Sequence, residues 1–543
     1  MGKYILSTKR APFMSDKDSI YQAESEVDAA FAASPLLKLG FAQAVWTLLS
    51  VNEDALFKAR TQASGAEDLR VFADNRLNEL SYPLRICFAN APESEALRRE
   101  YIADDYQHAI DWLKAARDYT QFSALFPLWH RNRIQLGLDG RRIIIDHGTD
   151  RKHEYEAYNR LVQREGRPEV EHEPMPQAVG EALWAATTAK DDWFRVKFNP
   201  CLVAGLKQWL APSLDARQTL PDGWKFSGFT LREFSAVVST LQSMMIAWAE
   251  TKRAVAEAGL PGLGYPSSVW VVSREELVAR LRRYTDVADG ALTKILDLLT
   301  FGSSGVREPD IATQPLIDLR NGSLLVAPFV WMSIAAERNL CVLLNQIPEQ
   351  KSIYAKLANT KEAETIAEFK EKLAPLGFAF GHGDVAGTDV DLAIIDHPNK
   401  TCLCLQLKWF IEPAEIREIN DRREDIADGI RQAKTVNKLH AQGDTKLMKT
   451  ILKIGGDYTF LSAVASQNWI GHGEMQDPEV PIIKVGHLLS EILETQSLGK
   501  VIDWLTRREY LPVEGKDYAI APIEISSGGW QATWYGIKPL ASE

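Results

Sequence analysis

The chain has 543 residues, a length at which a single hydrophobic core rarely keeps growing, so we expect two or three domains. Hydrophobic residues make up 45% and charged residues 25%, which is ordinary for a folded globular protein and argues against a long disordered arm. The formal net charge of −11 excludes a surface that is basic all round. Any contact with nucleic acid must therefore come from a local patch.

The five cysteines are scattered and contain no CxxC pair, which argues against zinc or redox chemistry and favours a reducing, cytoplasmic location. The N-terminal segment has too short an apolar run for a secretory signal. The longest apolar stretch near it, residues 41–51, is about half of the roughly 20 residues that a membrane helix needs. We expect a cytoplasmic protein with no membrane partner.

Residues 1–260 predict a mainly helical region. Apolar residues recur at three-and-four spacing, for example over 41–51 and 231–258. One β-hairpin is predicted near 134–146, because two apolar runs flank Asp139-Gly140, a dipeptide that favours a tight primed turn. The glycine- and proline-rich run that follows residue 258 predicts a domain boundary.

Residues 261–345 predict a small α/β subdomain or linker. A β-branched run at 269–272 precedes Ser273 and Glu276, whose spacing fits a capping box. Two helices then lead to a second tight-turn signal at Asn321-Gly322. The order strand, two helices and hairpin resembles a winged helix, and a structural subdomain without DNA contact is the alternative.

From residue 346 to the end of the chain, the pattern predicts an α/β domain with a mixed central sheet. A helix over 350–374 precedes a glycine-rich passage, and two strands follow at 390–396 and 401–410. A long helix begins near Pro413, and two further strands and a helix come after it. The predicted fold class is therefore α+β multidomain.

The two strands bring three polar side chains near one another. Asp391 begins the first strand, and Gln406 and Lys408 share a face of the second, because side chains alternate along a strand. Burying such groups costs free energy unless they satisfy one another or hold a metal. Phosphodiester hydrolysis needs a hard divalent cation on oxygen ligands and a positioned water. We predict a catalytic site in which Asp391 and Gln406 bind Mg²⁺ or Mn²⁺ and Lys408 orients the attacking water.

The stretch GTDVDLAIIDHPNKTCLCLQLKWF resembles the core of the PD-(D/E)XK, or restriction-endonuclease-like, superfamily, in which an Asp precedes a hydrophobic strand and its partner ends in Glu-x-Lys. The resemblance spans residues 350–490 and leaves the N-terminal half untouched. It implies a metal-dependent DNA endonuclease, of a class often found in bacterial restriction or phage defence. RNA remains an alternative substrate, and a homodimer is compatible with cutting both strands.

The resemblance extends to the neighbouring helices. Family members commonly carry an acidic residue on the preceding helix, and here Glu364 is preferred to Glu368 as a fourth catalytic residue and metal ligand. They also often carry a Gln on the helix after the lysine, which Gln432 matches as a nucleic-acid-binding residue.

A basic patch runs from Arg431 to Lys453. It holds six basic residues against one acid and is predicted to track a phosphate backbone, although a solvated helix face is the alternative reading. The six are Arg431, Lys434, Lys438, Lys446, Lys449 and Lys453.

Two departures from the family pattern bear on activity. Gln406 stands where the family has Glu, which removes a metal-binding charge. Asp389 precedes Asp391 by two residues and offers a second carboxylate. The alternative to an enzyme is a catalytically inactive nuclease fold that binds nucleic acid or serves as a scaffold.

Overall fold

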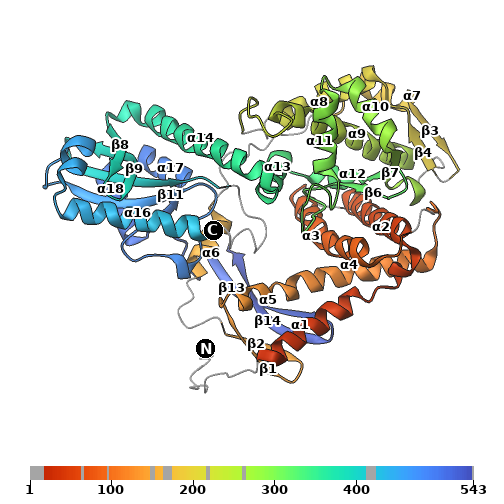
Figure 1. Ribbon diagram of the computed structural model, residues 1–543, viewed down its shortest axis with the longest axis horizontal. Helices are drawn as coiled ribbons and strands as arrows, with labels where there is room; N and C mark the ends of the chain where they lie inside the picture. Colours follow the sequence, from red (N-terminus) through yellow and green to blue (C-terminus); the bar gives the residue numbers. More distant parts are fainter. Residues whose placement is uncertain are drawn as a thin grey trace.

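The computed structural model has a mixed α+β architecture in which three bodies lie around a central junction (Figure 1). It describes residues 17–62, 66–93, 97–146, 153–162, 174–191, 193–215, 220–259, 265–410 and 423–540.

The largest body, on the right of Figure 1, is built mainly from helices around one continuous apolar core. The same core contains Trp248 and Trp331, which lie on opposite sides of the predicted boundary near residue 260. Described residues from 265 onward therefore contribute to the same core as the helices that precede them. The helices of its first part are η1 (Pro35–Leu39), α2 (Phe41–Gln62), α3 (Ala66–Asn90), α4 (Ala103–Ser123), α7 (Gln177–Ala185), α8 (Pro200–Asp215), α9 (Leu231–Glu257) and η2 (Tyr265–Ser267). A two-stranded sheet of β3 (Thr187–Lys190) and β4 (Trp193–Val196) lies at its edge.

The second part of the helical body contains a three-stranded antiparallel sheet in the order β5-β7-β6. Its elements follow the predicted order of strand, two helices and hairpin. The β6–β7 turn packs against α2 and α3. The guanidinium of Arg320 in this turn lies 4.2 Å from the ring centre of Phe41 and 4.6 Å from that of Phe88. The elements are β5 (Trp270–Ser273), α10 (Arg274–Tyr284), α11 (Asp289–Leu299), β6 (Leu316–Asp318), β7 (Ser323–Val326), α12 (Pro328–Ser333) and α13 (Ala336–Gln346).

The second body, at the bottom of Figure 1, contains a four-stranded sheet formed by two hairpins that lie far apart in the sequence. β1 (Gln135–Asp139) and β2 (Arg142–Asp146) form the hairpin expected from the sequence. β14 (Trp530–Pro539) pairs in parallel with β2, and β13 (Tyr518–Ser527) pairs antiparallel with β14. Helices α1 (Lys17–Ala32) and α5 (Leu125–His130) share its core. The last two described strands, β13 and β14, therefore belong to this four-stranded sheet.

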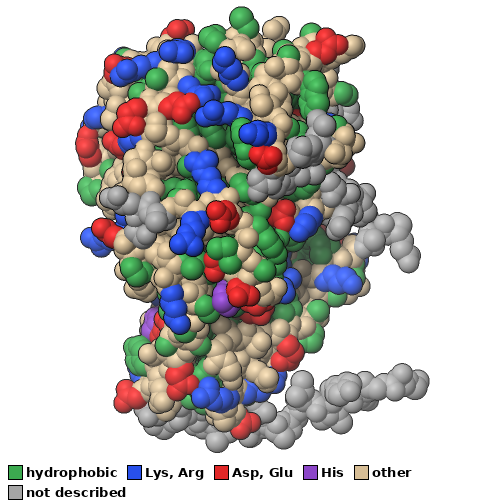
Figure 2. All heavy atoms as spheres, turned by 90° about the vertical axis from the view of Figure 1, so that its right-hand side faces the viewer, with side chains coloured by type: hydrophobic (Ala, Val, Ile, Leu, Met, Phe, Trp, Pro, Cys, Tyr) green, Lys and Arg blue, Asp and Glu red, His purple; other side chains and the backbone are tan. Residues whose placement is uncertain are grey.

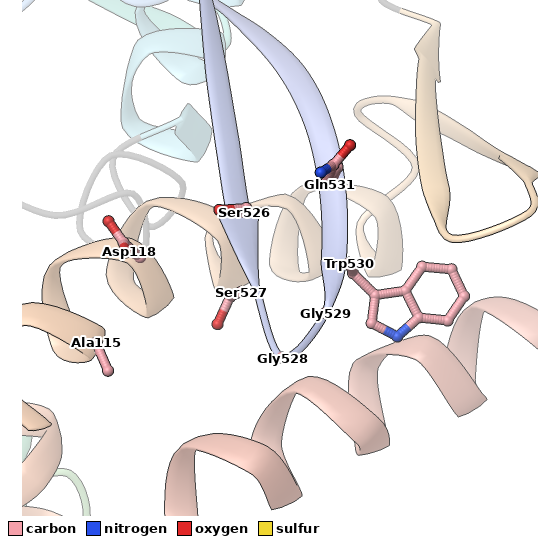
Figure 3. A pocket seen from close by; sticks show the side chains of 8 residues that line it. All are labelled: Ala115, Asp118, Ser526, Ser527, Gly528, Gly529, Trp530 and Gln531. Atoms are coloured by element: carbon pink, nitrogen blue, oxygen red, sulfur yellow. The ribbon is translucent and has the colours of Figure 1, made fainter.

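The turn between β13 and β14 lies against α1 and α4 and lines a pocket (Figure 3). Gly528 has a φ of 58°, and a Cβ there would lie 2.9 Å from the Cα of Val27, so glycine lets the turn approach α1. Trp530 donates from Nε1 to Glu26 at 3.1 Å. Asp118 is the one ionisable residue among those that line the pocket, so the pocket offers few groups that could support catalysis.

The third body, on the left of Figure 1, is a mixed sheet in the order β12-β11-β10-β9-β8. β9 is antiparallel to both β8 and β10, whereas β10, β11 and β12 are parallel. The two strands that carry the predicted site are confirmed as β9 and β10, and β8 is a strand formed by the glycine-rich passage. The strands are β8 (Ala379–Val385), β9 (Thr388–Asp396), β10 (Thr401–Lys408), β11 (Thr459–Ser466) and β12 (Ile482–Lys484).

Helices cover both faces of this sheet. One face packs Leu403, Leu405 and Leu407 with α14, α17 and α18, and the other packs Cys402 and Cys404 with α16 and η4. The predicted helix start near Pro413 lies outside the described residues, and α16 is described from Arg423. The helices are α14 (Pro348–Leu373), η3 (Ala374–Leu376), α16 (Arg423–Ala441), η4 (Lys446–Leu452), η5 (Gly473–Met475), α17 (Val485–Thr495) and α18 (Leu498–Arg507).

One helix of the N-terminal half, α6 (His153–Leu161), is built into this third body. Tyr155 and Tyr158 belong to its core. Lys484 is 1% exposed and donates from Nζ to the carbonyls of Asn159 and Val162, at 3.3 and 2.9 Å. Carbonyls at a helix C-terminus lack helical partners, so a buried ammonium both satisfies them and is stabilised by the helix dipole.

Basic and acidic side chains are interspersed over the face of the molecule shown in Figure 2, so the net negative charge is not gathered there. Every described helix falls short of the length or the apolar character needed to cross a lipid bilayer.

Candidate active site

The candidate site lies where the pairing of β9 with β10 ends. The last pair is Leu392 with Leu405. Just beyond it, the Oδ2 atom of Asp391 accepts the backbone N–H of Leu407 at 2.7 Å. A carboxylate thus takes the place of a strand carbonyl, and the strand end is held by a side chain that can also bind a ligand.

A β-bulge lies at the same point on the other side of β9. Gly381 of β8 pairs with Ala393, but Gly383 pairs with Val390, so β9 has one extra residue between these pairs. Bulges alter the alternation of side chains and are common next to active sites. The bulge includes Asp391, which explains why simple alternation does not describe this strand end.

Gln406 lies in the middle of the group and is fully buried. Its Nε2 atom donates to the backbone carbonyl of Asp389 at 2.7 Å. Its Oε1 atom has no hydrogen-bond partner within the described part of the chain. A buried amide oxygen without a partner is unfavourable, and it is a suitable ligand for a hard cation.

Lys408 is connected to Asp389 through Gln432 of α16. The Nζ atom of Lys408 donates to Gln432 Oε1 at 3.0 Å, and Gln432 Nε2 donates to Asp389 Oδ1 at 3.2 Å. Close packing makes this possible, because a Cβ on Gly429 would lie only 3.1 Å from Cε of Lys408. Gln432, predicted to bind nucleic acid, is here a residue that holds the lysine and an aspartate in place.

The acidic residue that α14 contributes to the group is Glu362. Its carboxylate interacts electrostatically with Lys408, Asp389 and Asp391. Glu364, the residue favoured from the sequence, instead pairs with Lys361 at 2.6 Å and has a side chain 48% exposed. Residues two apart on a helix differ by about 200° in direction, so both cannot face the sheet. Glu368 pairs with Lys372 at 2.6 Å, also at the surface.

A sequence signal for Glu362 exists. Glu362 precedes Ile366, Phe369 and Leu373 by four, seven and eleven residues, which places all four on one helix face. Phe369 and Leu373 are fully buried in the core of the third body, with Ile366 packed against it. The face of α14 that packs on the sheet therefore ends in Glu362.

The electrostatics of the group are dominated by burial. Burial raises the pKa of Asp391 to about 7; the Leu407 N–H opposes this rise, and the carboxylates of Asp389 and Glu362 add to it. Burial also raises the pKa of Glu362, against the attraction of Lys408. Carboxylates that disfavour one another's charge are stabilised by a cation between them.

The donor set fits a hard divalent cation only in part. Among the described residues, no three His, Cys, Asp or Glu side chains converge closely enough to hold a metal by themselves. Asp391 and the unsatisfied Oε1 of Gln406 present oxygen atoms on adjacent strands that a cation could take as ligands. Mg²⁺ usually keeps several waters and uses one or two carboxylates, so such a partial set is suitable.

The basic patch divides into paired and unpaired charges. Arg431 pairs with Asp428, and Lys434 pairs with Asp477 at 2.5 Å. Lys438 is exposed, and no carboxylate of the described residues pairs with it. The sequence alone does not show which of these three basic residues are paired. The acids that neutralise two of them lie a helical turn or many residues away along the chain.

Comparison of the chain with protein-family models, with curated proteins and with solved structures gives no match.

Proposed function

We propose that this protein is a Mg²⁺- or Mn²⁺-dependent nuclease that hydrolyses phosphodiester bonds in DNA. Its site comprises Asp391, Gln406 and Lys408, with Glu362 in the role first given to Glu364. The observation that carries the proposal is the buried, unsatisfied Oε1 of Gln406 beside Asp391, within reach of a lysine and further carboxylates.

Each residue has a defined part. Asp391 and Gln406 would hold the cation, whose bound form polarises a phosphoryl oxygen and lowers the pKa of water. Lys408 offers an ammonium, oriented by Gln432, that aligns the attacking water and offsets developing negative charge. Glu362 and Asp389, whose charges act on one another and on Asp391, would accept hydrogen bonds from metal-bound water.

The test is cleavage of plasmid DNA, single-stranded DNA and RNA by the full chain, with Mg²⁺, Mn²⁺ or a chelator. The Lys408→Ala variant is compared with Lys400→Ala, which removes a lysine just before β10, at the end far from the site. We expect metal-dependent cleavage of DNA by the wild type and Lys400→Ala and none by folded Lys408→Ala. Equal cleavage by Lys408→Ala contradicts the assignment.

The second candidate is an inactive nuclease fold that binds nucleic acid, and the observation that favours it is the neutral Gln406 in place of Glu. It predicts DNA binding by the wild type, with no cleavage under any metal condition.

A further inference from the structure

Four exposed lysines lie on or beside α16 and η4, the two elements that pack on one face of the sheet that carries the proposed site. Lys438 lies near the C-terminal end of α16, Lys446 and Lys449 lie on η4, and Lys453 follows it directly. In the described part of the chain, none of the four is paired with a carboxylate. We call these four residues the lysine ridge.

The lysine ridge differs from the other basic residues of the same segment. Arg431 and Lys434 are neutralised by Asp428 and Asp477. The acid nearest to the ridge in the sequence, Asp444, accepts the backbone N–H of Leu447 at 2.8 Å and so caps the start of η4. The ridge charges therefore remain available to an external anion.

The fold places the lysine ridge along the strand that borders the site. η4 packs on β8 so closely that a Cβ on Gly381 would lie 2.7 Å from the carbonyl oxygen of Ile451. Gly383, also against Ile451, pairs with Val390, which lies between the two aspartates of the site.

Helix α16 makes the second connection. Gln432 contacts Lys408 in the site, and Lys438 follows six residues later, about 9 Å along the helix axis at 1.5 Å per residue. Lys438 thus lies about 9 Å beyond Gln432 along the axis of α16, and η4 packs on β8, the strand that pairs with β9.

The chemistry of the ridge selects phosphates and not bases. Single-stranded nucleic acid is typically held by exposed aromatic rings on which bases stack. None of the exposed large hydrophobic side chains of the described chain lies in residues 423–466, and Phe460 is stacked against His440 at 3.9 Å. Lysine ammonium groups without aromatic partners bind a phosphate backbone without reading its sequence.

We infer that the lysine ridge binds the phosphate backbone of duplex DNA beside the bond that is cut. This inference rests on the proposed function and adds the form of the substrate and the side on which it extends. The ridge contributes to binding and not to the chemical step, so its loss raises KM and leaves kcat nearly unchanged.

The experiment measures binding of the full chain, carrying Lys408→Ala and without divalent metal, to a labelled duplex of about three helical turns. The ridge variant changes Lys438, Lys446, Lys449 and Lys453 to Gln. The matched control changes four exposed lysines elsewhere to Gln, namely Lys351, Lys500, Lys516 and Lys538. Thermal unfolding of both variants verifies that they fold.

We expect the ridge variant to bind the duplex at least about tenfold more weakly. The slope of log K against log salt should also become shallower, by about 0.9 for each phosphate that a ridge lysine no longer neutralises. The control variant should bind the duplex as tightly as the protein that carries Lys408→Ala alone. Equal affinity of the ridge and control variants overturns the inference, and so does an equal loss with single-stranded DNA of the same length.

Cleavage assays separate this inference from the proposed function. If the chain with native Lys408 cuts DNA and the ridge variant retains the same KM, the lysine ridge is not a substrate site and the nuclease assignment stands. If binding depends on the ridge but the chain with native Lys408 cuts nothing, the nuclease assignment fails and the duplex-binding surface remains.

Discussion

Gln406 donates a hydrogen bond of 2.7 Å from Nε2 to the backbone carbonyl of Asp389, and this bond commits the amide to one orientation. The Oε1 atom is then the free end of the amide, buried and without a partner among the described residues. An unsatisfied buried oxygen costs about 1–3 kcal/mol. Any cation that takes this oxygen as a ligand removes that cost.

The first prediction concerns Gln406→Glu, which introduces the family residue. The variant loses the donor to Asp389 and adds a carboxylate beside Asp391, so we expect a lower Tm without metal. Because two carboxylates bind a divalent cation better than one, Mg²⁺ should raise its Tm more than that of the wild type. Thermal unfolding with and without Mg²⁺ measures both effects. Gln442→Glu, at an exposed position, is the control, and an equal gain from Mg²⁺ in both variants contradicts the site.

The second prediction separates two acids on α14. Glu362→Gln removes a carboxylate that interacts with Lys408 and Asp391, and we expect cleavage to fall about 10- to 100-fold. Glu364→Gln removes a surface partner of Lys361 and should leave cleavage unchanged. Initial rates under identical metal and salt decide between them. If Glu364→Gln lowers cleavage and Glu362→Gln does not, Glu364 and not Glu362 is the acid of the site.

The third prediction is a pH dependence. Burial raises the pKa of Asp391 to about 7, and metal binds the deprotonated carboxylate, so cleavage should rise with pH and level off above about 7. Asp389→Asn removes a neighbouring negative charge, which lowers the pKa of Asp391 and moves the rising limb to lower pH. If the rising part of the pH profile stays in place or moves to higher pH in this variant, the charge of Asp389 does not raise the pKa of Asp391.

The same shift has a consequence for stability without metal. A carboxyl group with a raised pKa binds its proton more tightly in the folded state, so the contribution of Asp391 to the free energy of unfolding falls as pH rises from about 4 to about 7. Asp391→Asn should remove this part of the pH dependence. Chemical denaturation of both proteins across that pH range tests it.

The fourth prediction uses Gly429. Replacing a helical glycine with alanine ordinarily favours the helix by up to about 1 kcal/mol. Here the new Cβ would lie 3.1 Å from Cε of Lys408 and 3.2 Å from a methyl group of Val464, so the lysine must shift from Gln432. We expect Gly429→Ala to lower kcat about tenfold with little change in Tm. The control for helix propensity is Ala441→Gly. Gly443→Ala is unsuitable as a control, because Gly443 has a φ of 68°, which alanine does not readily adopt.

The fifth prediction concerns the attachment of α6. Lys484→Met keeps the length of the side chain but leaves the carbonyls of Asn159 and Val162 without their donor. We expect a loss of about 2–4 kcal/mol in the free energy of unfolding. Lys500→Met, at the surface, should cost little. If both variants unfold at the same denaturant concentration, the Lys484 contacts do not hold α6.

The parts of the site that follow from local pattern were predictable. Alternation along β10 places Gln406 and Lys408 on one face, and the apolar runs on both sides of a polar turn identify the hairpin with β9. The sequence did not single out Glu362 because α14 carries several acids, and choosing among them requires knowing which face packs on the sheet. That face was already marked by Phe369 and Leu373.

The non-local parts were not predictable from one sequence. The pairing of β14 with β2 leaves no local signal, because each hairpin has its own turn and its own alternation. The docking of α6 on the third body depends on Lys484, which reads as an ordinary polar residue at the end of a strand. Boundaries drawn along the chain therefore differ from the bodies that the fold forms.

The parallel pairing of β2 with β14 also sets an order of events during synthesis. β2 leaves the ribosome long before Gln531 and Ala532, its partners in β14, are made. At about 5–20 residues per second, the open edge of β2 waits for about 20 to 80 seconds. During that interval it is an unpaired strand edge of the kind that promotes aggregation, and the nascent chain would benefit from a chaperone that covers it. Completion of this sheet is therefore a late event, which follows translation of all the strands of the third body.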